Sequence, residues 1–179
     1  MKLFQFLNKK KETQFKCLCC GKVYDKPPLT FGSDFPSFYD SIPKNEIAER
    51  VEYQKSLCII DHHFFHRVRL EIPIINYFEN LNFDIWVSIS EENFIQRNEH
   101  WNNKDRIHFE SYFGYLQNEI PAYENTFNLH TISTENAPGF IPNAQIIDIK
   151  HQLYIDQQNG ISVERAINIA QSILKIQHN

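Results

Sequence analysis

Apolar and polar residues alternate through the middle of the chain, a pattern typical of half-buried β-strands. The run at 64–72 places one set of side chains on a single face: His66, Val68, Leu70 and Ile72. A shorter apolar run, 56–60, precedes it, and Asp61-His62-His63 lies between the two runs. We therefore expect a β-hairpin that turns at these three residues.

Further strands follow toward the C-terminus. Residues 83–89 alternate again and direct Ile85, Val87 and Ile89 to one side. Three shorter segments also have strand character: 112–116, 126–133 and 144–150. Together with the hairpin, these segments predict one mostly antiparallel sheet.

Three segments show helical patterns. The first covers about 43–53, where apolar residues recur at helical spacing. The second starts at Ser90, because a serine followed by two acids can cap free amides and suits the positive end of the helix dipole. The third starts at Ser162 and carries an apolar stripe. We expect an α+β fold, a mostly antiparallel sheet with helices packed on one face.

Length and composition indicate one main domain. A chain of 179 residues that is 42% hydrophobic can bury a core but is short for two domains. Residues 27–179 are expected to form this single α+β domain. Residues 1–26 are expected to form a basic arm that ends in a small cysteine-bearing element, with 1–14 as a short helical leader.

Charge is unevenly distributed along the chain. Residues 1–26 hold seven Lys against Glu12 and Asp25, which gives +5. The whole chain has 18 basic and 22 acidic residues, so residues 27–179 carry −9. An acidic body suits a basic protein partner and repels nucleic acid. We therefore expect a protein partner rather than DNA or RNA, and interpret the Lys run as a solvated tail.

The sequence shows no targeting or membrane segment. The apolar run near the start is too short for a signal-peptide core and is followed by Lys residues. No stretch approaches the roughly 18 apolar residues of a membrane span. A cytoplasmic location is therefore expected. Thiols stay reduced in that compartment, so clustered cysteines indicate metal-binding, redox-active or idle thiols rather than disulfides.

Three of the four cysteines fall within four positions near the start of the chain. The spacing Cys17-x-x-Cys20, followed by Gly21, matches one half of a zinc site, because both thiolates can reach one ion at about 2.3 Å. A closed zinc site needs four ligands, and the sequence contains no second C-x-x-C downstream. The cysteine element therefore predicts an incomplete zinc site, with idle thiols as the alternative.

Completion of that site would have to come from the hairpin. Cys58 with His62 or His63 is the nearest candidate set in the sequence. An extended strand separates Cys58 and His62 by about 13 Å, so one ion could bind both only if the chain turns at Asp61. Cys58 lies in an apolar run, where a free cysteine commonly behaves as a small buried hydrophobe.

A second candidate site groups Asp34, Asp61 and His63. Asp34 lies in a Pro-rich loop that can present a side chain, although an Asx turn is the explanation we favour for this residue. No oxyanion-hole motif accompanies these residues. We predict a binding site here, and it is where the alternative function, an enzyme of unknown reaction, would have its centre. His66 is expected to be a hydrogen-bonded core histidine rather than a ligand.

Several short motifs occur in a fixed order along the chain. They are Cys17-x-x-Cys20-Gly21, Phe31-Gly-Ser-Asp34-x-Pro36, Ser41-Ile-Pro43, Cys58-Ile-Ile-Asp61 with His63-Phe-Phe, Leu70-Glu-Ile-Pro73, Trp86-Val-Ser-Ile-Ser90 with Asn93-Phe94, and Tyr112-Phe-Gly-Tyr-Leu116 with Pro121. This series resembles the prokaryotic family catalogued as domain of unknown function 2199, from about Cys17 to the final helix. The resemblance brings no activity with it. Where the family pattern has His and Cys, this chain has Tyr24 and Arg69, so the resemblance implies fewer metal ligands here.

The acidic body and the lack of a complete catalytic set favour one function over the other. We expect a non-enzymatic cytoplasmic protein that binds a macromolecular partner and holds zinc at its N-terminal cysteine element.

Overall fold

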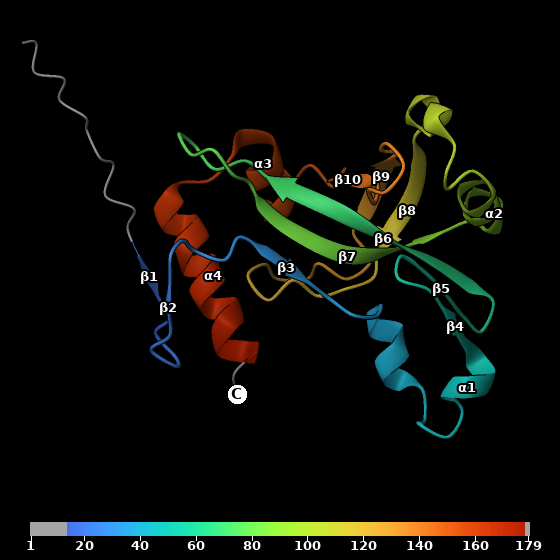
Figure 1. Ribbon diagram of the computed structural model, residues 1–179, viewed down its shortest axis with the longest axis horizontal. Helices are drawn as coiled ribbons and strands as arrows, with labels where there is room; N and C mark the ends of the chain where they lie inside the picture. The colour runs from blue at the N-terminus through green and yellow to red at the C-terminus, as the bar shows by residue number, and fades with distance from the viewer. Residues whose placement is uncertain (1–13, 178–179) are drawn as a thin grey trace, which may run out of the picture.

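The computed structural model describes residues 14–177 (Figure 1). A small antiparallel hairpin, β1 (Phe15–Lys16) with β2 (Val23–Tyr24), lies at one end of the molecule beside the C-terminal helix (Figure 1). The helical leader predicted at 1–14 falls almost wholly outside the described residues.

The main sheet closes on itself. Its strands are β3 (Thr30–Gly32), β4 (Val51–Tyr53), β5 (Leu57–Ile60), β6 (His63–Ile72), β7 (Leu81–Ile89), β8 (Tyr112–Leu116), β9 (His130–Thr134) and β10 (Asn143–Ile146). Their order is β3-β7-β8-β9-β10-β6-β5-β4, and β6 also pairs with β7. This extra pairing closes strands β6, β7, β8, β9 and β10 into a five-stranded barrel. Strand β3 extends the sheet beside β7, and strands β5 and β4 extend it beside β6.

The predicted α+β class is confirmed, but a simple antiparallel sheet with helices on one face is wrong. Most neighbouring strands are antiparallel, yet β10 pairs with β6 in parallel, with Asn143 opposite Arg69. This parallel pair closes the barrel between segments that lie far apart in the sequence. Alternating polarity defines the two faces of a strand but does not specify its neighbours. The strand pairing that closes the barrel could therefore not be predicted from the alternation of apolar and polar residues.

The hairpin of β5 and β6 forms as predicted. Ile60 pairs with His63, so the turn itself consists of Asp61 and His62, whose φ angles are 48° and 65°. Positive φ at both central positions gives the turn a twist that matches the twist of the flanking strands. Arg50 donates to both carboxylate oxygens of Asp61, which holds the turn against the preceding segment.

The barrel interior is apolar toward the end of β6 that contains Ile72. Its largest contribution comes from inward side chains of β6 and β7: Val68, Leu70, Ile72, Leu81, Phe83, Ile85 and Val87. Two helices, α3 (Gln152–Asn159) and α4 (Val163–Gln177), pack their apolar residues into the same core (Figure 1). A bridge between Ile74 and Ile161 connects the end of this region to the segment that precedes α4.

The other end of the barrel is filled by a buried polar network. Glu135 accepts hydrogen bonds from Arg97, from Arg106 and, at 2.6 Å, from the Tyr112 hydroxyl. The Tyr112 hydroxyl also lies 3.3 Å from Nδ1 of His66. The expectation of a hydrogen-bonded core histidine at His66 is confirmed, since this residue is fully buried.

His66 makes folding stability depend on pH. Burial, followed by the positive charge of Arg97, holds the pKa of His66 well below its ordinary value of 6.5. Below about pH 6.5 the unfolded chain therefore binds a proton that the folded chain does not, and stability falls as pH falls. We expect a loss of up to about 1.4 kcal/mol per pH unit from this residue.

Urea titrations at pH 7.5, 6.5 and 5.5 check this slope. A His66→Gln variant keeps a polar side chain but cannot take up the proton, so its free energy of unfolding should fall less steeply over that range. Equal slopes in the two proteins would contradict the assignment.

The helices confirm two of the three predicted segments. Helix α2 (Glu91–Glu99) starts after Ser90, whose side chain accepts from the Asn93 amide, and α4 follows Ser162 in the same way. The helix predicted at about 43–53 is reduced to α1 (Ile47–Arg50). A turn at 44–46 precedes it and β4 follows it directly, so both ends of the prediction are wrong. Helix α3 and the 3-10 turns η1 (Ser37–Ser41) and η2 (Lys104–His108) were not predicted. Within residues 14–177 every helix is too short or too polar to cross a bilayer.

Candidate metal centre

A tight turn between β1 and β2 carries the cysteines. The Cys17 amide donates to the Lys22 carbonyl at 2.8 Å, and the Gly21 amide donates to the Cys17 carbonyl at 3.0 Å. Gly21 has φ of +72°, a conformation that glycine adopts without strain. The two hydrogen bonds fold the chain back, and we name residues 17–22 the cysteine knuckle.

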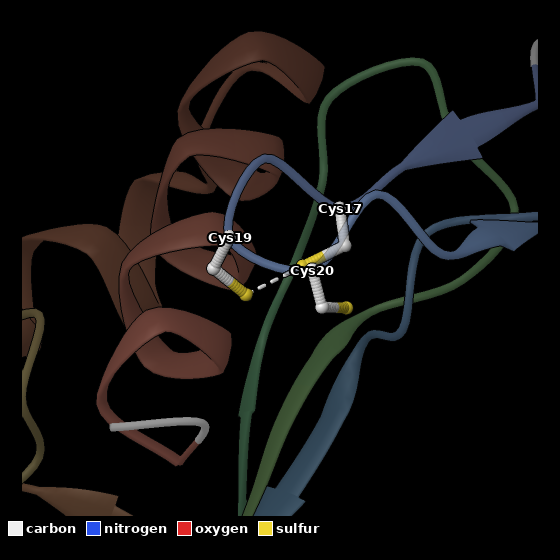
Figure 2. A group of neighbouring side chains, drawn as sticks. All are labelled: Cys17, Cys19 and Cys20. Carbon is white, nitrogen blue, oxygen red and sulfur yellow. Dashed lines mark hydrogen bonds between the residues drawn. The ribbon is translucent and has the colours of Figure 1, made fainter.

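Three sulfur atoms converge in the knuckle (Figure 2). The Sγ atoms of Cys17, Cys19 and Cys20 all lie within 4.8 Å of one another, and those of Cys17 and Cys19 are 2.8 Å apart. Cys17 is fully buried, whereas Cys19 and Cys20 are exposed. Within residues 14–177 no other group of three His, Cys, Asp or Glu side chains converges in this way.

This spacing suits a tetrahedral thiolate site after a small adjustment. Zn–S bonds of about 2.3 Å place two sulfurs about 3.8 Å apart in a tetrahedron. The Sγ atoms of Cys17 and Cys19 would thus move apart by about 1 Å, which side-chain rotation on an exposed turn can supply. The sulfurs therefore need no rearrangement of the fold to surround one ion.

The thiols of Cys17 and Cys19 differ in pKa. The Cys19 thiol, followed by the backbone amide of Cys20, donates toward Cys17 and lowers the pKa of Cys17 to about 7. The same contact, with burial second, raises the pKa of Cys19 to about 11. Metal binding would release the remaining thiol protons, because thiolates rather than thiols are the ligands.

The knuckle is anchored to α4. Gln171 accepts from the Leu18 amide at 3.0 Å and donates to the Lys16 carbonyl at 2.9 Å. The Cys19 thiol lies 3.8 Å from the Leu174 carbonyl near the end of α4. Phe15 and Cys17 belong to the main core cluster. Both sides of the knuckle are thus fixed, while Cys19 and Cys20 face solvent.

Cys19 is the candidate ligand that the sequence analysis did not include. The C-x-x-C spacing drew attention to Cys17 and Cys20, which the structure brings together as expected. The sequence did contain a sign that Cys19 could take part, namely its position between Cys17 and Cys20. A turn that brings Cys17 and Cys20 together also brings the thiol of Cys19 close to them.

The proposed completions lie elsewhere in the molecule. Cys58 is buried in a separate cluster with Ile60, Phe65 and Trp86, and burial raises the pKa of its thiol to about 11. Strand β5 and the turn after it lie at the opposite end of the long axis from β1 and β2 (Figure 1). His62 and His63 at that turn are exposed and do not converge with the knuckle.

The three residues of the second candidate group each contact a different partner. Asp34 is exposed, and its carbonyl accepts from Arg67 at 3.4 Å. Asp61 is held by Arg50, and this contact lowers the pKa of its carboxyl. His63 is exposed and meets the Phe38 ring edge-on, with ring centroids 5.6 Å apart.

Comparison with known proteins places the chain in a family. Residues 16–161 match the sequence profile of a family described as uncharacterized protein conserved in bacteria (DUF2199). The matched range contains all three knuckle cysteines and the whole barrel, and it ends just before α4. No curated protein and no solved structure matches. The chain therefore belongs to the bacterial family domain of unknown function 2199, as its ordered motifs indicated.

Proposed function

We propose that this protein is a cytoplasmic, non-enzymatic accessory protein that holds one zinc ion at Cys17, Cys19 and Cys20 and binds a basic protein partner. The zinc-binding half of this proposal rests on the convergence of three cysteine sulfurs within 4.8 Å of one another. Three thiolates favour a soft or borderline ion such as Zn²⁺ over Mg²⁺ or Ca²⁺, which take oxygen ligands. Iron–sulfur clusters are commonly held by four cysteines, one more than the knuckle supplies, so we favour a single ion.

A structural role for the metal fits the position of the knuckle. Strands β1 and β2 have only two residues each, so the hairpin has few backbone hydrogen bonds of its own. An ion bound to three of its side chains would rigidify the turn that Gln171 attaches to α4. Zinc in such a site contributes free energy of folding directly.

The partner part of the proposal rests on surface chemistry. Residues 27–179 carry −9, since 11 basic residues oppose 20 acidic ones. Helix α2 exposes Ile95 among three acids: Glu91, Glu92 and Glu99. The outer face of β8 and β9 exposes Phe113, Tyr115 and His130 as one cluster, with ring centroids 4.9 to 5.6 Å apart. Exposed apolar groups rimmed by charge are typical of protein interfaces.

The alternative, an enzyme centred on Asp34, Asp61 and His63, receives less support. Asp61 is already engaged by Arg50, and His63 packs edge-on against Phe38. If native co-purification returned no partner while a hydrolytic screen gave turnover, the accessory role would fail and the enzyme would be preferred.

Metal analysis tests the zinc site. We expect about one zinc per purified chain, and each of Cys17→Ser, Cys19→Ser and Cys20→Ser should weaken zinc binding by more than about a hundredfold, because changes beyond the ligands alone cost 10- to 100-fold. Cys58→Ala is the matched control, since it removes a thiol at the other end of the molecule. A metal content that is equal in all four variants, or absent from the wild-type protein refolded with zinc, would contradict the proposal.

A further inference from the structure

A groove of about 660 Å³ runs along the outer face of β6, away from the knuckle. Its floor is formed by the outward side chains Arg67, Arg69 and Glu71. Lys55 stands on one rim, and the loop between β9 and β10 forms the other. Binding sites for small organic molecules commonly have volumes of 300 to 1,000 Å³, so the groove has room for one.

Arg67 offers hydrogen-bond donors to this groove. The guanidinium makes two hydrogen bonds within residues 14–177, and both start from Nη2, which donates to the carbonyls of Ser33 and Asp34. Its Nε is buried, whereas its Nη1 makes no hydrogen bond within residues 14–177, and none of the described carboxylates forms an ion pair with Arg67. Nη1 is therefore the donor left for a ligand. The guanidinium lies over the Trp86 ring, 5.2 Å from the centroid, which fixes its plane. A guanidinium held in this way is suited to bind an oxyanion.

The charge of the groove is opposite to that of the body. Its lining holds three cations, Lys55, Arg67 and Arg69, against two carboxylates, Glu71 and Asp84. Arg69 and Asp84 neutralise each other through two hydrogen bonds of 2.7 and 2.8 Å. The groove is thus a positive region on a body of −9, and such a region attracts anions.

The buried polar network adds to this positive charge from below. Its two arginines, Arg97 and Arg106, share the single carboxylate of Glu135. Both guanidiniums lie against the Trp101 ring, at 5.1 and 4.7 Å from its centroid, and Trp101 also lines the groove. Arg97 further donates to the Ser56 carbonyl in the groove wall.

The second rim is apolar and held in place. Phe140 at the tip of the β9–β10 loop is 65% exposed and lines the groove. Asn136 donates to the Ile141 carbonyl at 2.8 Å and to the Asn143 side chain at 3.0 Å, which ties the two ends of this loop together. A large exposed phenyl ring on a fixed loop gives a ligand an apolar surface to contact.

We infer that this groove binds a small organic molecule that carries a phosphate or carboxylate group on an apolar ring. The oxyanion pairs with Arg67 and Lys55, and the ring packs against Phe140. This site is independent of the zinc centre, because none of its lining residues belongs to the knuckle.

Two-dimensional ¹H–¹⁵N NMR on the full chain tests the site with three probes: phenyl phosphate, benzoate and inorganic phosphate. We expect saturable shifts of the Trp101 indole and the Asn136 and Asn143 side-chain amides, with a dissociation constant below about 1 mM for phenyl phosphate or benzoate. Whichever of these two binds more tightly identifies the oxyanion. Inorganic phosphate should bind at least about tenfold more weakly, because it lacks the ring.

Charge variants provide the control. Arg67→Gln should weaken the tighter probe at least about tenfold, and Lys55→Met, on an exposed turn, should weaken it about three- to tenfold without affecting the fold. Lys150→Met makes the same charge change outside the groove and should bind like the wild-type protein. The inference is overturned if no probe gives saturable shifts at these side chains up to about 10 mM, or if Lys55→Met and Lys150→Met bind equally.

Discussion

Replacing Glu135 with Gln is expected to destabilise the protein by about 3 to 5 kcal/mol. Glu135 is the shared partner of Arg97 and Arg106, and all three side chains are at most 3% exposed. Removing the carboxylate charge leaves two buried guanidiniums without a counter-charge, and the amide nitrogen of Gln replaces one of the two oxygens that now accept from Arg97, Arg106 and Tyr112. Stranded buried charges cost more free energy than the intact pair contributes to stability.

Urea denaturation of Glu135→Gln beside Glu99→Gln measures this effect. Glu99 is exposed on α2, so the same chemical change there should alter the free energy of unfolding by less than about 0.5 kcal/mol. Similar midpoints for the two variants would show that the buried network contributes nothing specific to the fold.

Replacing Gly114 with Ala is expected to destabilise the protein by about 3 kcal/mol. Alanine is ordinarily the better strand residue, by about 0.5 to 1 kcal/mol. At this site the added Cβ would lie 2.4 Å from Cγ1 of Val87 and 2.5 Å from the Ser88 carbonyl. The second contact is with backbone, which cannot rotate away, so the overlap outweighs the conformational gain.

Gly139→Ala is the matched control for that prediction. A Cβ at Gly139 would meet no atom within 4 Å, although its φ of +92° still disfavours alanine. The expected cost is therefore only about 1 to 2 kcal/mol of local backbone strain, smaller than for Gly114→Ala. Thermal unfolding of both variants measures this difference. A melting temperature for Gly114→Ala that equals or exceeds that of Gly139→Ala would contradict the close approach of β8 to β7.

Local features of the fold could be predicted because their causes are local. The β5–β6 turn is specified by Asp61 and His62, and α2 and α4 begin at the side-chain caps Ser90 and Ser162. The inward face of β6 follows directly from alternation. Each of these depends on residues within a few positions of one another, so a single sequence contains the signal.

Features that depend on distant segments could not be predicted. The barrel closes where Asn143 meets Arg69 in parallel, and no periodicity within either strand specifies that contact. The buried network gathers Arg97, Arg106, Tyr112 and Glu135 from four separate segments, each of which reads as an ordinary surface charge or aromatic residue in the sequence. The β8–β9 pairing, which sets Tyr112 opposite Ser133, and the positions of α2 and η2 bring these residues together.

The metal centre was predicted in part. Cys17 and Cys20 were expected to converge from spacing alone, and they do. From the sequence we predicted that further ligands would come from Cys58 and the hairpin histidines. The structure instead places a third thiol inside the turn itself, at Cys19. Sequence separation was a poor guide, because a six-residue turn packs against α4 more than a hundred residues away.

X-ray absorption at the zinc edge of the zinc-loaded protein tests the central claim most directly. Three cysteine ligands predict a shell of three sulfurs at about 2.3 Å together with one nitrogen or oxygen at about 2.0 to 2.1 Å. The Cys19→Ser protein should lose one sulfur from that shell. A shell with fewer than three sulfurs, or one that is unchanged in Cys19→Ser, would contradict a zinc site built from Cys17, Cys19 and Cys20.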